Sequence, residues 1–187
     1  MPWDFNSLIN GRTWVAEPEK LAQIGEERIA AMAQIGAEDQ FRWAHDNIMP
    51  NEDDGPRERR SMQLATLYKE WTTEDAVAIW NTIMPDRGIS GIAIKASRFR
   101  PGHFLTPHDD ADGEKRVVAI VLSLNPEWEP HWGGQLQLED NQGALQVLSP
   151  EHNVLHMFTV PRRHFVSQVA TYAPRGRIAI SGWLTRD

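Results

Sequence analysis

The feature that most constrains the fold of this chain is a series of short apolar or alternating segments in its second half. They are separated by Gly, Pro, Asn and Asp, which are the residues that favour turns. Strands are predicted at residues 89–99, 103–107, 116–124, 135–139, 145–148, 153–158, 164–170 and 177–184. The segment EDNQGA at 139–144 is typical of a hairpin turn. About eight short strands at such spacing favour a sandwich or barrel, and a double-sheet jelly roll in particular.

The first half of the chain is predicted to be mostly helical. A helix is expected over residues 18–35, ended by Gly36, and a shorter one over 41–48. Residues 50–60 are charged and contain Pro and Gly, which indicates a loop, and residues 62–68 are predicted to form a strand. The clearest helix spans 72–84 and begins with a capping box of Thr72 and Asp75. Its predicted core-facing stripe is Ala76, Ile79, Trp80, Ile83 and Met84.

These segments predict one domain, residues 1–187. Residues 1–95 would form a mostly helical support region with a strand, and residues 96–187 the jelly-roll core. With 187 residues, 41% apolar and 24% charged, the chain is long and apolar enough for an ordinary globular core. The fold class is therefore mainly β, with helices packed on the outside.

Charge and composition narrow the function. A net charge of −7 argues against a nucleic-acid binder, which leaves small molecules and proteins as partners. The absence of cysteine excludes disulfides, thiolate metal sites and cysteine nucleophiles. The start, MPWDFNSLING, lacks the features of a secretory signal, and the longest apolar run, VVAIVL, is too short for a bilayer. We therefore expect a cytoplasmic protein without membrane contact, while the oligomeric state is not set by any sequence feature.

The segment LTPHDDADG at 105–113 contains the pattern that suggests chemistry. His108 and Asp110 are two residues apart, so at a strand end their side chains share one face while Asp109 points away. One further histidine from another strand would complete a two-histidine, one-carboxylate triad. Such a triad binds one side of Fe(II) and leaves positions open for other ligands.

His164 is the best candidate for the third ligand. It opens one predicted strand and Arg177 opens the next, after the turn YAPRG. If these strands adjoin, both side chains face one cavity, and an inward arginine needs an anion there. On the last strand, Arg177, Ala179, Ser181 and Trp183 share a face. A keto-acid that chelates iron and is held by its far carboxylate would satisfy both features.

Five ordered segments resemble the iron- and 2-oxoglutarate-dependent dioxygenases. The similarity is to the prolyl 4-hydroxylase-like branch, which includes hypoxia-inducible-factor and ribosomal-protein prolyl hydroxylases. It covers about residues 96–185. The segments are HDD at 108–110, KRVVAIVLSLNPEW at 115–128, GGQLQL at 133–138, HFVSQV at 164–169 and RIAISGW at 177–183.

The resemblance implies a double-stranded β-helix and assigns functional residues. His108, Asp110 and His164 would bind Fe(II), and Arg177 the 2-oxoglutarate carboxylate, with a hydroxyl from Ser181 and a wall from Trp183. The expected reaction consumes O2, releases succinate and CO2, and hydroxylates an unactivated C–H, with a prolyl residue of a protein or peptide as the favoured substrate. Two cosubstrate positions depart from the pattern: Phe99 and Ser123 stand where relatives place tyrosines.

Other residues are candidates for substrate contact. His103 flanks the expected mouth, with a solvated loop residue as the alternative. Arg116 is a candidate for contact with a substrate carbonyl, with a surface ion pair as the alternative, and Trp128 for a substrate platform, with loop packing as the alternative. His131 is a similar loop candidate, and His156 is expected in the core or near the ligands. Three other functions are weighed: hydroxylation of a free amino acid or small metabolite, a non-catalytic cupin-like metal-binding module, and a zinc hydrolase. The last leaves Arg177 without a role.

Overall fold

A computed structural model of the chain describes residues 4–9, 12–15, 34, 41–48, 61–111 and 115–187. The helices in this part are α3 (Met62–Trp71), α4 (Glu74–Ile83) and the short 3-10 helix η2 (Pro130–Trp132). The strands are β1 (Asp4–Ile9), β2 (Arg12–Val15), β3 (Trp43–Ile48), β4 (Gly91–Phe99), β5 (Phe104–His108), β6 (Arg116–Ser123), β7 (Leu136–Glu139), β8 (Leu145–Leu148), β9 (Val154–Thr159), β10 (His164–Val166) and β11 (Arg177–Thr185). None of the described helices has the length and apolar character that crossing a bilayer requires.

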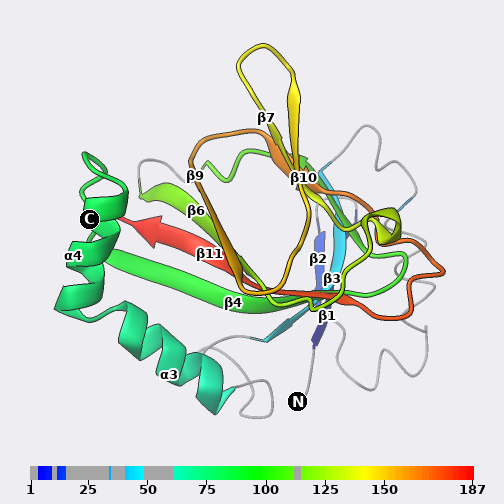
Figure 1. The fold of residues 1–187 in the computed structure, drawn as a ribbon, viewed down its shortest axis with the longest axis horizontal. Helices are drawn as coiled ribbons and strands as arrows, with labels where there is room; N and C mark the ends of the chain where they lie inside the picture. The colour runs from blue at the N-terminus through cyan, green and yellow to red at the C-terminus, as the bar shows by residue number, and fades with distance from the viewer. Residues whose placement is uncertain (1–3, 10–11, 16–33, 35–40, 49–60, 112–114) are drawn as a thin grey trace.

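The described strands form a single sheet in the order β8-β7-β10-β5-β3-β4-β11-β6-β9, with β1 joined to β3 and β2 joined to β1. Figure 1 shows this sheet curling around a centre, with the β7–β8 hairpin projecting from one end. Residues of β7, near one end of the order, and of β9, at the other, line the same cavity. The sheet therefore folds over on itself, and the fold is a double-stranded β-helix, as predicted.

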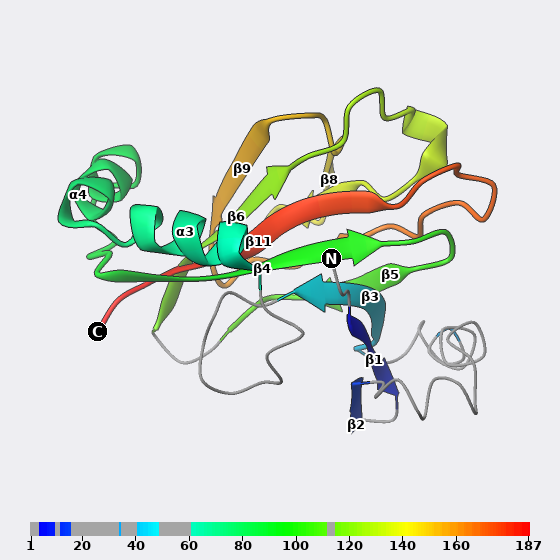
Figure 2. The same cartoon turned by 90° about the horizontal axis from the view of Figure 1, so that it is seen from below.

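The two α-helices cover the outer face of the β4, β11 and β6 strands, at the end of the sheet seen on the left of Figure 2. Leu64 of α3 and Trp80 of α4 are buried in one apolar cluster with residues of these strands, such as Ile94. Along β4, Ile92 and Ile94 of this cluster alternate with Lys95, Ser97 and Phe99, which line the cavity. The helices thus stabilise the wall that carries the site without contributing side chains to it.

All eight strands predicted in the second half are present. The strand expected over residues 164–170 is shorter than predicted, because β10 ends at Val166 and Val169 forms only an isolated bridge to Gly133. The turn at 139–144 does join β7 and β8 as a hairpin.

Two predictions in the first half are wrong. Residues 43–48 form strand β3, not a helix, because they pair with β1 over residues 43–47, with β5 at 43–44 and with β4 at 46–48. Cross-strand ion pairs from the buried Asp46 to Arg98 (2.7 Å) and Arg100 (3.0 Å) hold this strand in the sheet.

Residues 62–71 form helix α3 where a strand was predicted over 62–68. Ser61 caps it by accepting a hydrogen bond from the Leu64 amide at 3.2 Å. Its apolar positions at 64, 67, 68 and 71 follow helical spacing and meet the core. The predicted strand ended at residue 68, so this spacing was missed.

Helix α4 is confirmed, but its cap and its buried face differ from the prediction. Thr73, not Thr72, is the N-cap, and its hydroxyl accepts from the Ala76 amide. Of the predicted stripe, Trp80 is buried, whereas Ile79 is 57% exposed and Ile83 is exposed as well. The helix meets the core mainly through Trp80, which packs edge to face with Trp71 of α3 at 5.7 Å, and Met84 is partly buried against the same cluster.

The predicted helix over 18–35, apart from the helical residue Gln34, and the predicted loop over 50–60 lie outside the described residues. Strands β1 and β2 were not predicted; they extend the sheet from the edge of β3.

Candidate metal centre and cavity

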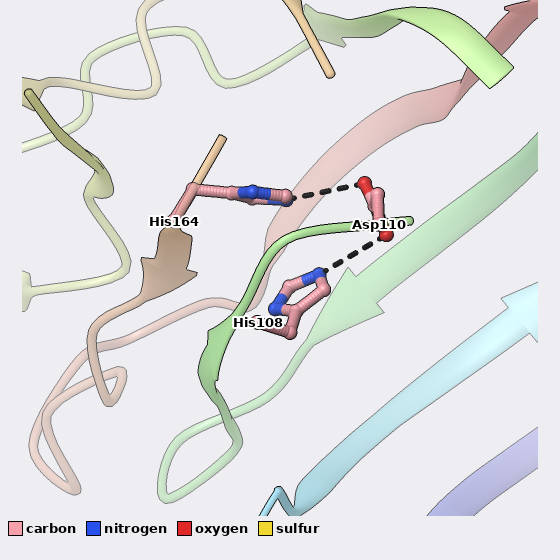
Figure 3. A group of neighbouring side chains, drawn as sticks. All are labelled: His108, Asp110 and His164. Atoms are coloured by element: carbon pink, nitrogen blue, oxygen red, sulfur yellow. Dashed lines mark ion pairs between the residues drawn. The ribbon is translucent and has the colours of Figure 1, made fainter. Parts of the chain in front are cut away.

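Three potential ligands converge at the end of β5. His108 is the last residue of β5, His164 is the first of β10, and the two are register partners across the ladder. Asp110 faces the Nε2 atoms of both rings, with Oδ1 3.3 Å from Nε2 of His108 and Oδ2 3.2 Å from Nε2 of His164 (Figure 3). One ligand atom from each residue lies within 4.8 Å of the others. The sequence-predicted triad is therefore assembled in space.

Backbone carbonyls orient both imidazoles. Nδ1–H of His108 donates to the carbonyl of Thr106 at 3.0 Å, and Nδ1–H of His164 donates to that of Arg162 at 2.7 Å. Because a carbonyl only accepts, Nδ1 carries a proton, and Nε2 is the ring nitrogen that faces Asp110 and would bind a metal. Metal-binding histidines are oriented in this way. Two lone pairs and a carboxylate facing one another repel unless a cation or a proton lies among them.

The carboxyl of Asp110 is held in its charged form. Burial raises its pKa, but hydrogen bonds and charge interactions with His108 and His164 outweigh burial, so the net pKa is well below the ordinary value. A carboxylate that stays ionised beside two imidazoles is the donor set that Fe(II) prefers among oxygen and nitrogen ligands.

The prediction for the two adjacent aspartates is right in outcome but wrong in its reason. Asp110 has a φ of 60°, so the strand has ended and the left-handed backbone of this residue turns the carboxylate toward the rings. Asp109 is exposed, and its Oδ1 accepts only from the nearby Ala111 amide at 3.0 Å. The strand period suggested the same face for His108 and Asp110, yet a turn places the ligand.

The triad opens into a cavity of about 640 Å³ whose far end contains Arg177. This arginine is 2% exposed, and its Nε has no hydrogen-bond partner in the described part of the chain. Its guanidinium lies 5.3 Å from the centre of the Phe99 ring, its register partner on β4. Burial lowers the pKa of Arg177 to about 10. A buried guanidinium without an acidic partner among the described residues is a site for an anion.

The predicted neighbourhood of His164 and Arg177 arises differently from what we expected. Their strands do not adjoin, because β5, β3 and β4 lie between β10 and β11 in the sheet order. Curling of the sheet, not strand pairing, brings both residues to one cavity.

Three more predicted residues line this cavity: Ser181, Trp183 and Arg116. The hydroxyl of Ser181 lies 3.5 Å from that of Ser97. The guanidinium of Arg116 covers the Trp183 ring at 3.8 Å, a cation–π contact that holds both side chains at the cavity wall.

Three other predicted residues lie elsewhere. Ser123 is fully buried beside Ala179 and does not line the cavity. Trp128 donates its indole N–H to the carbonyl of Gly133 and packs in a core cluster, so it is not a substrate platform in this structure. His103 is buried, not solvated, and burial, with Arg100 and Arg98 nearby, lowers its pKa to about 3.

Two more histidines, His131 and His156, also lie outside the cavity lining. His131 stacks on Tyr172 away from the cavity, and His156 lies on β9 outside its lining.

Two cavity residues were missed from the sequence, His45 and Lys95. His45 stacks on Phe99 at 5.0 Å with an interplanar angle of 12°, and desolvation and the neighbouring Lys95 hold its pKa well below the ordinary value. It lay in the segment predicted to be helical, so its direction was wrong. Lys95 was detectable, because it is four residues before Phe99 on the same face of a predicted strand.

The fold and the site together define a double-stranded β-helix with a two-histidine, one-carboxylate set beside a cationic cavity. Residues 94–185 match the model of the 2OG-Fe(II) oxygenase superfamily, and the chain belongs to this superfamily. Members of the family use iron and 2-oxoglutarate, as its description states. No curated protein sequence matches the chain.

Solved structures support the fold. A prolyl-4-hydroxylase from Pseudomonas putida aligns with a TM-score of 0.62 at 19% identity, over 99% of this chain and 94% of that one. A prolyl hydroxylase from Trichoplax adhaerens, in complex with a peptide fragment of the hypoxia inducible factor oxygen degradation domain, aligns at 0.58 and 20% identity, over 75% and 62%. A 2OG-Fe(II) oxygenase family oxidoreductase from Burkholderia pseudomallei aligns at 0.60 and 16% identity, over 81% and 70%.

Proposed function

We propose that the chain is an Fe(II)- and 2-oxoglutarate-dependent dioxygenase that hydroxylates an unactivated C–H of its substrate and releases succinate and CO2. One observation carries the proposal. Three converging acceptors, at His108, Asp110 and His164, share a cavity with a buried arginine that has no acidic partner among the described residues. A ligand that is both a metal chelator and a carboxylate would occupy both ends.

The residues of the cavity have distinct proposed roles. His108, Asp110 and His164 would hold Fe(II), which, when bound, supplies the activation of O2. Arg177 would bind the far carboxylate of 2-oxoglutarate, with the Ser181 hydroxyl near it and Phe99 as an apolar wall. Trp183, pinned by Arg116, would exclude water from one side of the bound cosubstrate.

The favoured substrate is a prolyl residue in a protein or peptide. The support is the fold likeness to two prolyl hydroxylases, one of them solved with a peptide. The cavity opens beside Phe41, which is 44% exposed, and Trp43, an aromatic pair at 5.0 Å that suits an apolar ring. The alternative within the enzyme class is a free amino acid or another small metabolite.

A second candidate function is a binding module that holds metal without turnover. The observation that favours it is Phe99 and the buried Ser123, which give the cosubstrate no hydroxyl at two positions where the resemblance expects one.

Anaerobic titration with Fe(II) and then 2-oxoglutarate separates these possibilities. The proposal expects a visible charge-transfer band from the chelate, absent in His108→Ala, and succinate release when O2 and a peptide or metabolite panel are added. A band without succinate release would favour the binding module. Absence of the band in the wild-type protein would overturn both the metal and the cosubstrate assignments.

A further inference from the structure

Lys95 is a basic residue inside the cavity for which the proposed reaction has no use. It lies on β4 two residues before Ser97 and four before Phe99, and all three side chains line the cavity. Across the ladder it is paired with Ser181. Its side chain is half-buried and faces the cavity.

Lys95 and Arg177 mark different ends of this wall. Arg177 is paired with Phe99, four residues along β4 from Lys95, a separation of about 13 Å at ~3.3 Å per residue. The charges that influence Lys95 most are those of Asp110 and Arg116, next to the metal centre. A carboxylate held by Arg177 would therefore leave Lys95 available for a different group.

Lys95 has no hydrogen bond or ion pair within the described part of the chain. The nearby acid, Asp110, already faces His108 with one oxygen and His164 with the other. Desolvation lowers the pKa of Lys95 by more than the charge of Asp110 raises it, so the nearby acid does not offset the cost of burying the ammonium group.

Two other cations of the cavity, Arg163 and Arg116, have close neighbours. The guanidinium of Arg163 pairs with Glu139 at 3.0 Å, and that of Arg116 lies over Trp183. Because Fe(II) and the 2-oxoglutarate dianion carry equal and opposite charges, their joint binding would leave the charge of Lys95 uncompensated.

We propose that Lys95 binds a carboxylate of the primary substrate, so that the enzyme acts on an acidic substrate whose reacting carbon lies close to that carboxylate. The inference rests on the proposed function and names its substrate class. The carboxylate can come from an acidic residue beside a prolyl residue of a peptide, or from the α-carboxylate of a free amino acid.

The test compares matched substrates on wild-type protein loaded with Fe(II) and 2-oxoglutarate. One arm uses proline peptides that differ only in Asp against Asn, or Glu against Gln, next to the proline. The other arm uses L-proline against L-prolinamide. Perturbation of the anaerobic chelate band reports binding, and gain of one oxygen atom by mass together with succinate release reports turnover.

The expected result is a preference for the carboxylate member of a pair by about 10- to 100-fold in kcat/KM, the range for a hydrogen bond to a charged group. Lys95→Met should abolish the preference through KM, Lys95→Arg should restore part of it, and Lys115→Met, at an exposed lysine, should keep it. Which arm shows the preference identifies the source of the carboxylate.

Three outcomes would overturn the inference. The first is equal turnover of both members of every pair. The second is a chelate band that no carboxylate compound perturbs, together with no turnover of any of these compounds. The third is a loss of 2-oxoglutarate affinity in Lys95→Met. The last would assign Lys95 to the cosubstrate. A wild-type protein that forms no chelate band would instead overturn the proposed function.

Discussion

At the scale of single residues, two adjacent carboxylates of this chain have different roles. Asp110 is turned toward His108 and His164 by a left-handed backbone conformation, which aspartate tolerates better than most residues. Asp109 faces outward and caps the local turn. Position along the chain therefore does not decide which acid faces the two histidines; the backbone dihedral does.

A pair of matched substitutions tests this assignment. Asp110→Asn keeps the side-chain shape and suits the left-handed backbone but removes the charge. We expect Fe(II) affinity to fall by more than about 100-fold, because loss of a residue that only hydrogen-bonds to a metal ligand already lowers metal affinity by about 10- to 100-fold. Asp109→Asn should bind iron as the wild type does. Anaerobic Fe(II) titration measures both, and equal losses would contradict the assignment.

Arg177 allows a prediction with opposite signs for binding and stability. Arg177→Met removes a buried charge that has no acidic partner in the described chain, so the melting temperature of the ligand-free protein should not fall. The affinity for 2-oxoglutarate, measured by the chelate band, should fall by about 10- to 100-fold. A large loss of melting temperature with unchanged 2-oxoglutarate affinity would make Arg177 a structural residue.

At the scale of elements, the helices show how burial decides what a pattern means. Helix α4 has the apolar spacing of a core-facing helix, yet it meets the core mainly through Trp80, which is 7% exposed and donates its indole N–H to the carbonyl of Trp71 at 3.2 Å. Ile79, its neighbour in the same predicted stripe, faces outward.

The two neighbours should respond unequally to truncation. Trp80→Ala should lower the free energy of unfolding by ~3–5 kcal/mol, because it leaves a void between α3, α4 and the sheet. Ile79→Ala should change it by less than about 0.5 kcal/mol, as is usual for an exposed site. Urea unfolding measures both values, and similar values for both variants would mean that α4 packs through a wider face.

At the scale of the whole molecule, the curled sheet buries histidines in their neutral form. His103 has a pKa of about 3 and His45 one well below the ordinary value, in both cases chiefly because of burial. Between pH 6.5 and about 3 the unfolded chain binds protons that these folded residues do not. The contribution of these histidines to the free energy of unfolding is therefore fully present above about pH 6.5 and is lost as the pH drops through this window.

Urea midpoints measured from pH 7.5 to 4.5 in the presence of a chelator should decrease toward acid. Each buried neutral histidine contributes a slope of at most about 1.4 kcal/mol per pH unit. His103→Asn should reduce the slope, and His152→Asn, at an exposed position, should leave it unchanged. A slope insensitive to His103→Asn would mean that other groups cause the acid sensitivity.

The sequence by itself determined the strands of the second half, the triad His108, Asp110 and His164, and the arginine at 177. Alternation of period two and turn residues are local properties, and a strand pattern of this kind expresses burial directly. The same period places Lys95 on the same face of its strand as Phe99, although the sequence did not single out Lys95.

Only the tertiary structure decided how these pieces meet. In the folded sheet, residues 43–48 form a central strand, and three strands lie between those of His164 and Arg177. Trp128 and His103 lie outside the cavity lining, whereas His45 stacks on Phe99. Strand order and curling depend on pairings between residues far apart in the chain, and these long-range contacts override local propensity. Short sequence motifs therefore predicted the chemical groups of the site, whereas the shape and charge of its cavity depend on how the sheet closes on itself.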